Sequence, residues 1–276
     1  MTRTLLALLA LGTMLLLAAC GGDPAPPATT AAAPPPKRLR IIFPEGLNVR
    51  EMGDRVAAVR EIAVAKRGVK PKLTRARYLT AVGRSRPPKP FLRDWKRGME
   101  GFLFPALYEF TQFSTADELV AAQLAAFRRN FARVNLSYAK SKNLTPYDVL
   151  KIASMIEKET VAPRERKLVA AVIYNRLRNR MPLGIDATIR YGLDIPGTKS
   201  LTKAAIASDN PYNTRRFPGL PPTPIANPGL ASIQAAAHPA KVNYLYFVRK
   251  PDKVHHFFTA SDTAFAQYEC QHGYGC

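Results

Sequence analysis

The sequence is short of acidic residues, histidine and cysteine. Of its 276 residues only 20 are Asp or Glu, against 41 Lys or Arg, which gives a formal net charge of +21. The four histidines lack metal-site spacing and no HExxH sequence occurs, so we expect no metal and no cofactor. There is no GxSxG segment and no phosphate-cradling glycine loop, which excludes a serine-hydrolase elbow and a P-loop nucleotide site.

Long apolar runs are also absent. Leu5–Leu17 follows the positively charged Arg3 and is too short to span a bilayer comfortably. It ends in Leu17-Ala18-Ala19-Cys20, which resembles a bacterial lipobox. We therefore predict a signal peptide over residues 1–19 and acylation of Cys20, which would anchor the protein to the cell membrane with its body on the extracytoplasmic side, in the cell wall or periplasm. The alternative is an uncleaved anchor helix with an incidental cysteine.

The next segment, residues 20–36, is rich in Pro, Ala, Gly and Thr, and we predict that it is a disordered linker after the lipidated cysteine. Basic charge is concentrated beyond it, since residues 37–100 contain eighteen Lys or Arg against six Asp or Glu. Such an excess is usual in nucleic-acid binders, but an exported protein rarely meets nucleic acid, and we expect no such partner. Anionic lipids and acidic wall polymers fit the charge, as does a solvated basic surface that reflects compositional bias.

The two remaining cysteines, Cys270 and Cys276, lie close together at the end of the sequence. An exported context permits a disulfide between them, and the intervening glycines make the segment pliable. We predict that they are joined, with two free thiols as the alternative.

The body of the chain predicts an α+β fold. A strand at 39–43, a helix capped by Asn48, a second helix capped by Thr74 that ends before Gly83, and a strand within 102–110 form a small module over 37–110. The rest, residues 111–276, is predicted to be helical with a β-hairpin near its end. Its elements are helices at 115–134, from Thr145, from Pro163 to about 180 and at 232–237, a hairpin of 244–248 and 254–258, and a last helix capped by Ser261 or Asp262. Between them runs a long Pro/Gly-rich loop around 212–229, whose apolar residues favour an ordered structure.

The helix that Thr145 begins carries two acids, Glu157 and Glu159. On a helical wheel both lie on the shoulders of the apolar face, on opposite sides, where a cleft wall would be. Ordinary surface pairing of both with Arg164, Arg166 or Lys151 is the alternative. We expect Glu159 to pair with Arg164 and stay ionised, while Glu157, which has no cation among its helical neighbours, keeps its proton more easily.

Several segments in order resemble one known family. "EGFLFPALYEF", "IASMIEKET", "VAAVIYNRL", "YNTRRFPGLPPTPIANPG", "AAAHPAKVNYLYFV" and "HHFFTA" are similar to the YceG-like family, the MltG-type endolytic murein transglycosylases. The resemblance runs from about Leu39 to Tyr268. It implies a LysM-like module over 37–110 followed by the catalytic domain over 111–276. It implies Glu157 as the catalytic residue and a substrate-binding set of Glu159, Asp186, Tyr212, Asn213, Thr214 and His238.

The family's activity would explain why one acid suffices. Most glycosidases need two carboxylates, whereas a lytic transglycosylase uses the C6 hydroxyl of the substrate's own N-acetylmuramic acid to leave a 1,6-anhydro end. The implied partners are peptidoglycan glycan strands, the membrane through the lipid anchor, and peptidoglycan synthases. The sequence departs from the family pattern at Gly184, Ala187, Ala106 and Leu107, which leaves open a wall-binding lipoprotein that has lost cleavage.

Overall fold

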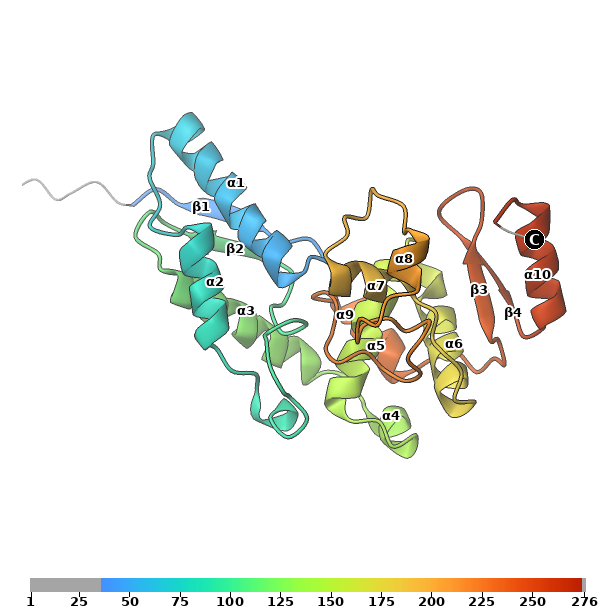
Figure 1. The fold of residues 1–276 in the computed structure, drawn as a ribbon. Helices are drawn as coiled ribbons and strands as arrows, with labels where there is room; N and C mark the ends of the chain where they lie inside the picture. Colours follow the sequence, from blue (N-terminus) through green and yellow to red (C-terminus); the bar gives the residue numbers. More distant parts are fainter. Residues whose placement is uncertain (1–35, 275–276) are drawn as a thin grey trace, which may run out of the picture. The chain divides into compact units, whose positions relative to one another are not determined.

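The computed structural model describes residues 36–274, which belong to one compact unit (Figure 1). Helices make up most of the regular secondary structure in this part of the chain, and two small antiparallel sheets lie toward its two ends in sequence. The fold class is therefore α+β, as predicted. The strands are β1 Leu39–Ile42, β2 Leu107–Phe110, β3 Tyr246–Arg249 and β4 His256–Thr259. The α-helices are α1 Val49–Arg67, α2 Arg75–Arg84, α3 Ala116–Phe131, α4 Ser137–Ser141, α5 Pro146–Glu159, α6 Arg166–Arg178, α7 Asp186–Leu193, α8 Lys203–Ile206, α9 Leu230–Ala237 and α10 Asp262–Gln271.

The first sheet and the helices beside it confirm the predicted local signals. β1 pairs antiparallel with β2, and alternate residues of each strand are buried, so that one face lies on the core. Asn48 caps α1, as predicted, and forms a capping box with Glu51. Thr74 caps α2, but this helix continues through Gly83 to Arg84. One exposed glycine weakens a helix by only about 1 kcal/mol, and burial of Tyr78 and Val82 offsets that cost.

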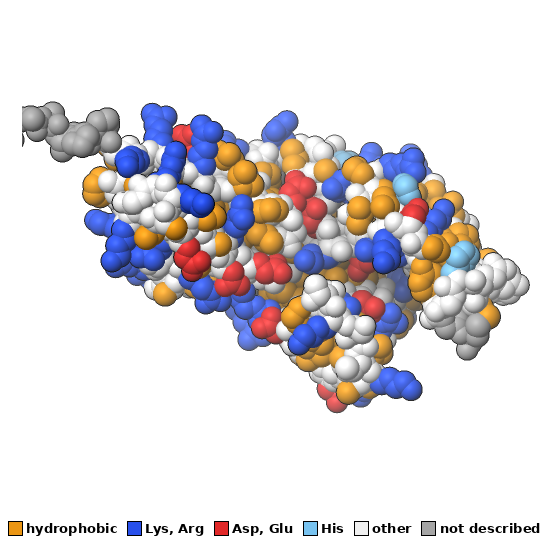
Figure 2. All heavy atoms as spheres, turned by 90° about the horizontal axis from the view of Figure 1, so that it is seen from above, with side chains coloured by type: hydrophobic (Ala, Val, Ile, Leu, Met, Phe, Trp, Pro, Cys, Tyr) orange, Lys and Arg blue, Asp and Glu red, His pale blue; other side chains and the backbone are white. Residues whose placement is uncertain are grey.

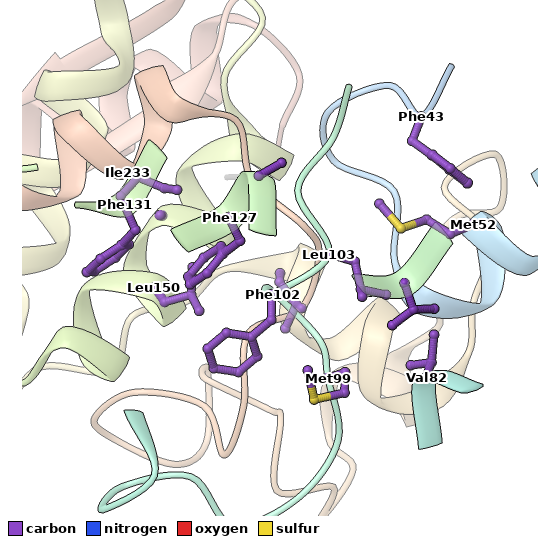
Figure 3. Close-up of a cluster of buried hydrophobic side chains, with 14 of the residues drawn as sticks. Phe43, Met52, Val82, Met99, Phe102, Leu103, Phe127, Phe131, Leu150 and Ile233 are labelled. Carbon is purple, nitrogen blue, oxygen red and sulfur yellow. The ribbon is translucent and has the colours of Figure 1, made fainter. Parts of the chain in front are cut away.

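The core is continuous from the first sheet to the central helices. Figure 3 shows Phe43 and Met52 at one end of a buried cluster and Phe131, Leu150 and Ile233 at the other. Aromatic rings fill its middle with centroid separations that favour mutual packing; the closely packed rings are those of Phe91, Phe102, Phe127 and Phe131. This core crosses the domain boundary predicted between residues 110 and 111. The division into two domains stays a prediction.

Helix α5 lies in the middle of this core. It begins after Thr145, as predicted. Thr145 and Asp148 form a capping box at its start, and Pro146 occupies its first position. α5 packs against α6 and α9, and its apolar residues are fully buried along the face that they line. Its last turn carries Glu157 and Glu159.

The long loop between α8 and α9 is ordered, as predicted, because it is hydrogen-bonded to the N-terminal segment. The Asn227 backbone accepts from Gly46 N–H (3.0 Å) and donates to the Leu47 carbonyl (2.9 Å). The fully buried Asn227 side chain also accepts from the backbone N–H groups of Gly101 and Leu103 at 3.0 and 2.9 Å. One buried amide therefore joins three segments that are far apart in sequence.

Three short helices were not predicted, namely α4, α7 and α8. α7 matters most, because it forms a wall of the site. The residue before it is Ile185, which offers no side-chain cap, and Gly192 lies within it, so the usual signals for a helix are missing.

The C-terminal hairpin and helix agree with the prediction in order and type. β3 pairs antiparallel with β4, and Ser261 caps α10. Cys270 is disulfide-bonded; its predicted partner, Cys276, lies outside the described residues, as do the predicted signal peptide and Cys20. Within residues 36–274 no helix is long and apolar enough to cross a bilayer.

Candidate functional site

The two acids at the end of α5 have different surroundings. Glu157 is half-buried, and its carboxylate accepts the backbone N–H of Gly229 at 2.9 Å. Gly229 is the N-cap of α9 and has no side chain to satisfy the first turn. The carboxylate of Glu45 lies against the Cα atom of the same glycine, where any side chain would collide with it. Glu157 therefore acts as part of the cap of α9.

Glu159 faces a cleft instead. The cleft has a volume of about 640 Å³ and lies between the start of α1, the end of α5 and α7. Charged and polar side chains form most of its wall. Its charged residues are Arg50, Glu51, Asp54, Arg75, Lys158, Glu159, Asp186, Arg190, Asp194 and Arg249.

Each of the other acids of the cleft has a direct partner. Asp54 pairs with Arg75 at 2.5 Å, Asp186 with Arg215 at 2.7 Å and Asp194 with Arg50 at 2.7 Å. Glu51 caps α1 by accepting the backbone N–H of Asn48 at 2.8 Å. Glu159 differs from these acids. Among the described residues it has no ion-pair partner within 4.0 Å, and it does not cap its own helix.

Burial raises the pKa of the Glu159 carboxyl above its ordinary value. The charge of Arg249 opposes this effect, the charge of Asp186 adds to it, and the Ala187 backbone N–H and Arg190 again lower the pKa. Arg249 is also bound to the main chain here, since it donates to the Glu159 carbonyl at 2.8 Å. The net effect is a raised pKa in a polar cleft, the direction of change that a general acid requires.

The expected pairing of Glu159 with Arg164 is wrong. Arg164 instead contacts the His255 ring at 2.9 Å. The contact could not be foreseen because His255 lies in the C-terminal hairpin, 91 positions away in the sequence. The local reason for preferring Glu157 as the proton donor is therefore lost.

Asp186 lies in the same cleft as Glu159, at the first position of α7. There its negative charge is favoured by the helix dipole, and Arg215 holds it at 2.7 Å. Ala187 follows it, and its backbone N–H donates a hydrogen bond to Glu159. This segment departs from the family pattern at Gly184 and Ala187. It nevertheless places an acid and a backbone N–H donor in the cleft.

The Tyr-Asn-Thr segment mostly supports its own loop. Asn213 is fully buried and donates to the carbonyls of Ile206 and Ser208, both at 2.8 Å. Thr214 accepts the Ile185 N–H at 3.0 Å, which fixes the start of α7. Their polar atoms are engaged within the protein and lie outside the cleft lining.

Tyr212 is placed differently from its two neighbours. Its hydroxyl contacts Thr223 at 2.8 Å, and its ring packs edge-on against Tyr191 with centroids 5.1 Å apart. Both rings line a second cavity. His238, at the end of α9, is half-buried and belongs to neither the cleft nor this cavity.

Glu100 is a buried acid that sequence reasoning missed. It is only 7% exposed. Its carboxylate accepts from Val49 N–H at 3.2 and 3.1 Å, from the Tyr191 hydroxyl at 3.2 Å and from the Asn227 amide at 2.9 Å. Burial raises its pKa to about 7 despite these donors. The only signal in the sequence was its place in "EGFLFP", beside Gly101, whose φ of 90° suits glycine.

Glu100 should make stability depend on pH. Its folded-state pKa lies above the ordinary value of 4.5, so the folded protein holds this proton more tightly than the unfolded chain does. The resulting stabilisation is complete below about pH 4.5 and is lost as the pH rises through about 7, with a total on the order of 3 kcal/mol. We therefore compare the free energies of unfolding of the wild type and Glu100→Gln, measured with denaturant. The advantage of the wild type should shrink by that amount as the pH rises from below about 4.5 to above about 7. A difference that does not vary with pH would contradict the assignment.

Among residues 36–274, no group of three or more His, Cys, Asp or Glu side chains is placed to hold a metal ion. Basic side chains outnumber acidic ones in the sequence, 41 against 20. Figure 2 shows Lys and Arg gathered most densely over the end formed by α1, α2 and the first sheet.

Comparisons with known proteins agree with this fold and these motifs. The chain is 37% identical over 160 residues to an endolytic murein transglycosylase of Bacillus subtilis, covering 58% of this chain and 44% of the relative. It is 38% identical over 154 residues to one of Streptococcus pneumoniae, covering 54% of this chain and 28% of the relative. The chain thus spans less than half the length of these relatives.

A solved structure gives the same result for the fold. The crystal structure of a yceG-like protein from Listeria monocytogenes superposes with a TM-score of 0.69 and 28% identity, covering 83% of this chain and 76% of that one. The model of the YceG-like family matches residues 28–269. The chain therefore belongs to the YceG-like family.

Proposed function

We propose that the protein is an endolytic lytic transglycosylase that cleaves peptidoglycan glycan strands between N-acetylmuramic acid and N-acetylglucosamine. The observation that carries the proposal is the half-buried Glu159, whose pKa is raised in a polar cleft where every other acid is in an ion pair or a helix cap. The names of the relatives from Bacillus subtilis and Streptococcus pneumoniae support the substrate class.

In this proposal Glu159 takes the catalytic role that the family resemblance gave to Glu157. The Glu159 carboxyl donates its proton to the oxygen that leaves C1 of N-acetylmuramic acid. The C6 hydroxyl of the same sugar then bonds to C1, and its proton passes to the Glu159 carboxylate. The acid is restored, one glycosidic bond is exchanged for another, and no water is consumed. The product strand ends in a 1,6-anhydro sugar, which would limit the length of new strands.

Because the nucleophile belongs to the substrate, the protein has to orient the sugar rather than activate water. Arg190 and Arg249 on the cleft wall are suited to binding carboxylates of the substrate's lactyl or peptide groups. Asp186 is suited to accepting a hydrogen bond from a sugar hydroxyl.

Mass spectrometry of digested glycan tests the proposal. Purified strands incubated with residues 37–276 should yield fragments with 1,6-anhydromuramyl ends. Binding without any new ends would favour the alternative, a wall-binding lipoprotein of the same fold.

We further propose membrane attachment through an acylated Cys20, based on the sequence Leu17-Ala18-Ala19-Cys20. Cells fed a clickable fatty acid should label the wild-type protein, and Cys20→Ala should abolish the label because the acceptor sulfur is gone. Labelling that persists in this variant would contradict the proposal. Recruitment of peptidoglycan synthases and a LysM-like role for residues 37–110 remain predictions from the family resemblance.

A further inference from the structure

A second cavity adjoins the catalytic cleft. It has a volume of about 400 Å³, within the range of small-molecule sites. Arg50 and Tyr191 line both the cleft and this cavity, so the two hollows meet at these side chains. The cavity therefore lies next to the cleft that contains Glu159.

The cavity wall is mostly apolar and aromatic. Leu79 and Val82 of α2 line it together with Met99, Tyr191 and Tyr212. The two tyrosines lie close together because the backbone at Gly192 approaches Tyr212. A Cβ atom added at Gly192 would lie only 2.7 Å from the Tyr212 Cβ atom. Asn210 fixes Tyr212 further by accepting its backbone N–H at 2.9 Å.

The tyrosine rings are held by buried partners and need little reordering to bind a ligand. The Tyr191 hydroxyl donates to Glu100 at 3.2 Å, and the Tyr212 hydroxyl contacts Thr223 at 2.8 Å. Glu100, which also lines the cavity, is itself held by Val49 N–H and the Asn227 amide. It therefore supports Tyr191 from a fixed position. Preorganised rings of this kind bind at a low cost in entropy.

We propose that this cavity is an additional subsite for one N-acetylhexosamine ring of the glycan strand, beyond the units that flank the cleaved bond. The apolar C–H face of the sugar fits an aromatic ring, and its acetamido methyl group fits against the apolar side chains of Leu79, Val82 and Met99. The proposal rests on the proposed function and adds a reason for internal cleavage. A strand that fills the subsite extends beyond Glu159, so sites within long strands are favoured over chain ends.

Gly83 offers a way to block the cavity without disturbing the core. It lines the cavity, and a Cβ atom added there would meet nothing within 4 Å. We expect Gly83→Trp to lower kcat/KM for long strands by about tenfold or more and to leave turnover of a substrate confined to the cleft intact. Thr80→Trp, on the exposed side of the same helix, is the matched control and should leave both rates unchanged.

Methyl NMR tests binding independently of turnover. In the Glu159→Gln protein, Leu79, Val82 and Met99 report on the cavity, while Ile195 and Ile225 report on the cleft. A murein octasaccharide should shift both sets of methyl signals, and a disaccharide should shift the cleft set alone. Octasaccharide shifts confined to the cleft set would overturn the subsite and leave the proposed function standing. No shift in either set would overturn both.

Discussion

Glu159→Gln should lower the turnover of glycan strands by about two to four orders of magnitude, the scale of general acid catalysis. The amide preserves the shape of the side chain but has no proton to give to the leaving oxygen. The fold should remain intact because Glu159 forms no ion pair among the described residues. Turnover is measured from the rate at which anhydro ends appear, and folding from circular dichroism.

Glu157→Gln is the matched control, since it makes the same change two residues earlier in the same helix. A glutamine oxygen can still accept the Gly229 N–H, so the cap of α9 should survive. We expect turnover within about threefold of the wild type, as for the loss of a minor interaction. Loss of activity in this variant with retention in Glu159→Gln would reverse the two roles.

Asn227→Ala should reduce the free energy of unfolding by about 3–5 kcal/mol, because several buried polar groups lose their partner at once. The backbone N–H groups of Gly101 and Leu103 lose their acceptor, and Leu47 and Glu100 lose a donor. Denaturant unfolding monitored by circular dichroism gives the value.

Asn135→Ala provides the comparison, since Asn135 is exposed and accepts one backbone N–H, that of Ser137. Its cost should not exceed about 1 kcal/mol. If the two variants unfold at the same denaturant concentration, Asn227 does not join the segments in the way described.

Local signals predicted most of the helices and strands, because the determinants lie within a few residues. The helices that begin after Asn48, Thr115 and Thr145, for example, each start with a capping box whose two side chains are three positions apart. α7 was missed because its start is fixed from outside, by the Thr214 hydroxyl that accepts the Ile185 N–H.

The site could be predicted only in part. The helical wheel correctly placed Glu157 and Glu159 on opposite shoulders of α5, but it cannot tell which shoulder borders a cleft. That depends on α7 and Arg249, which come from distant parts of the sequence. Glu100 was missed for a similar reason, since its partners Val49, Tyr191 and Asn227 are at least 51 positions away.

Digestion in H₂¹⁸O tests the central claim most directly, because the proposed reaction closes the C6 hydroxyl on C1 without using water. Mass spectrometry should find the new muramyl ends in the anhydro form and without ¹⁸O, and the Glu159→Gln protein should form about a hundredfold fewer of them. New reducing ends that carry one ¹⁸O atom would show hydrolysis and contradict the account.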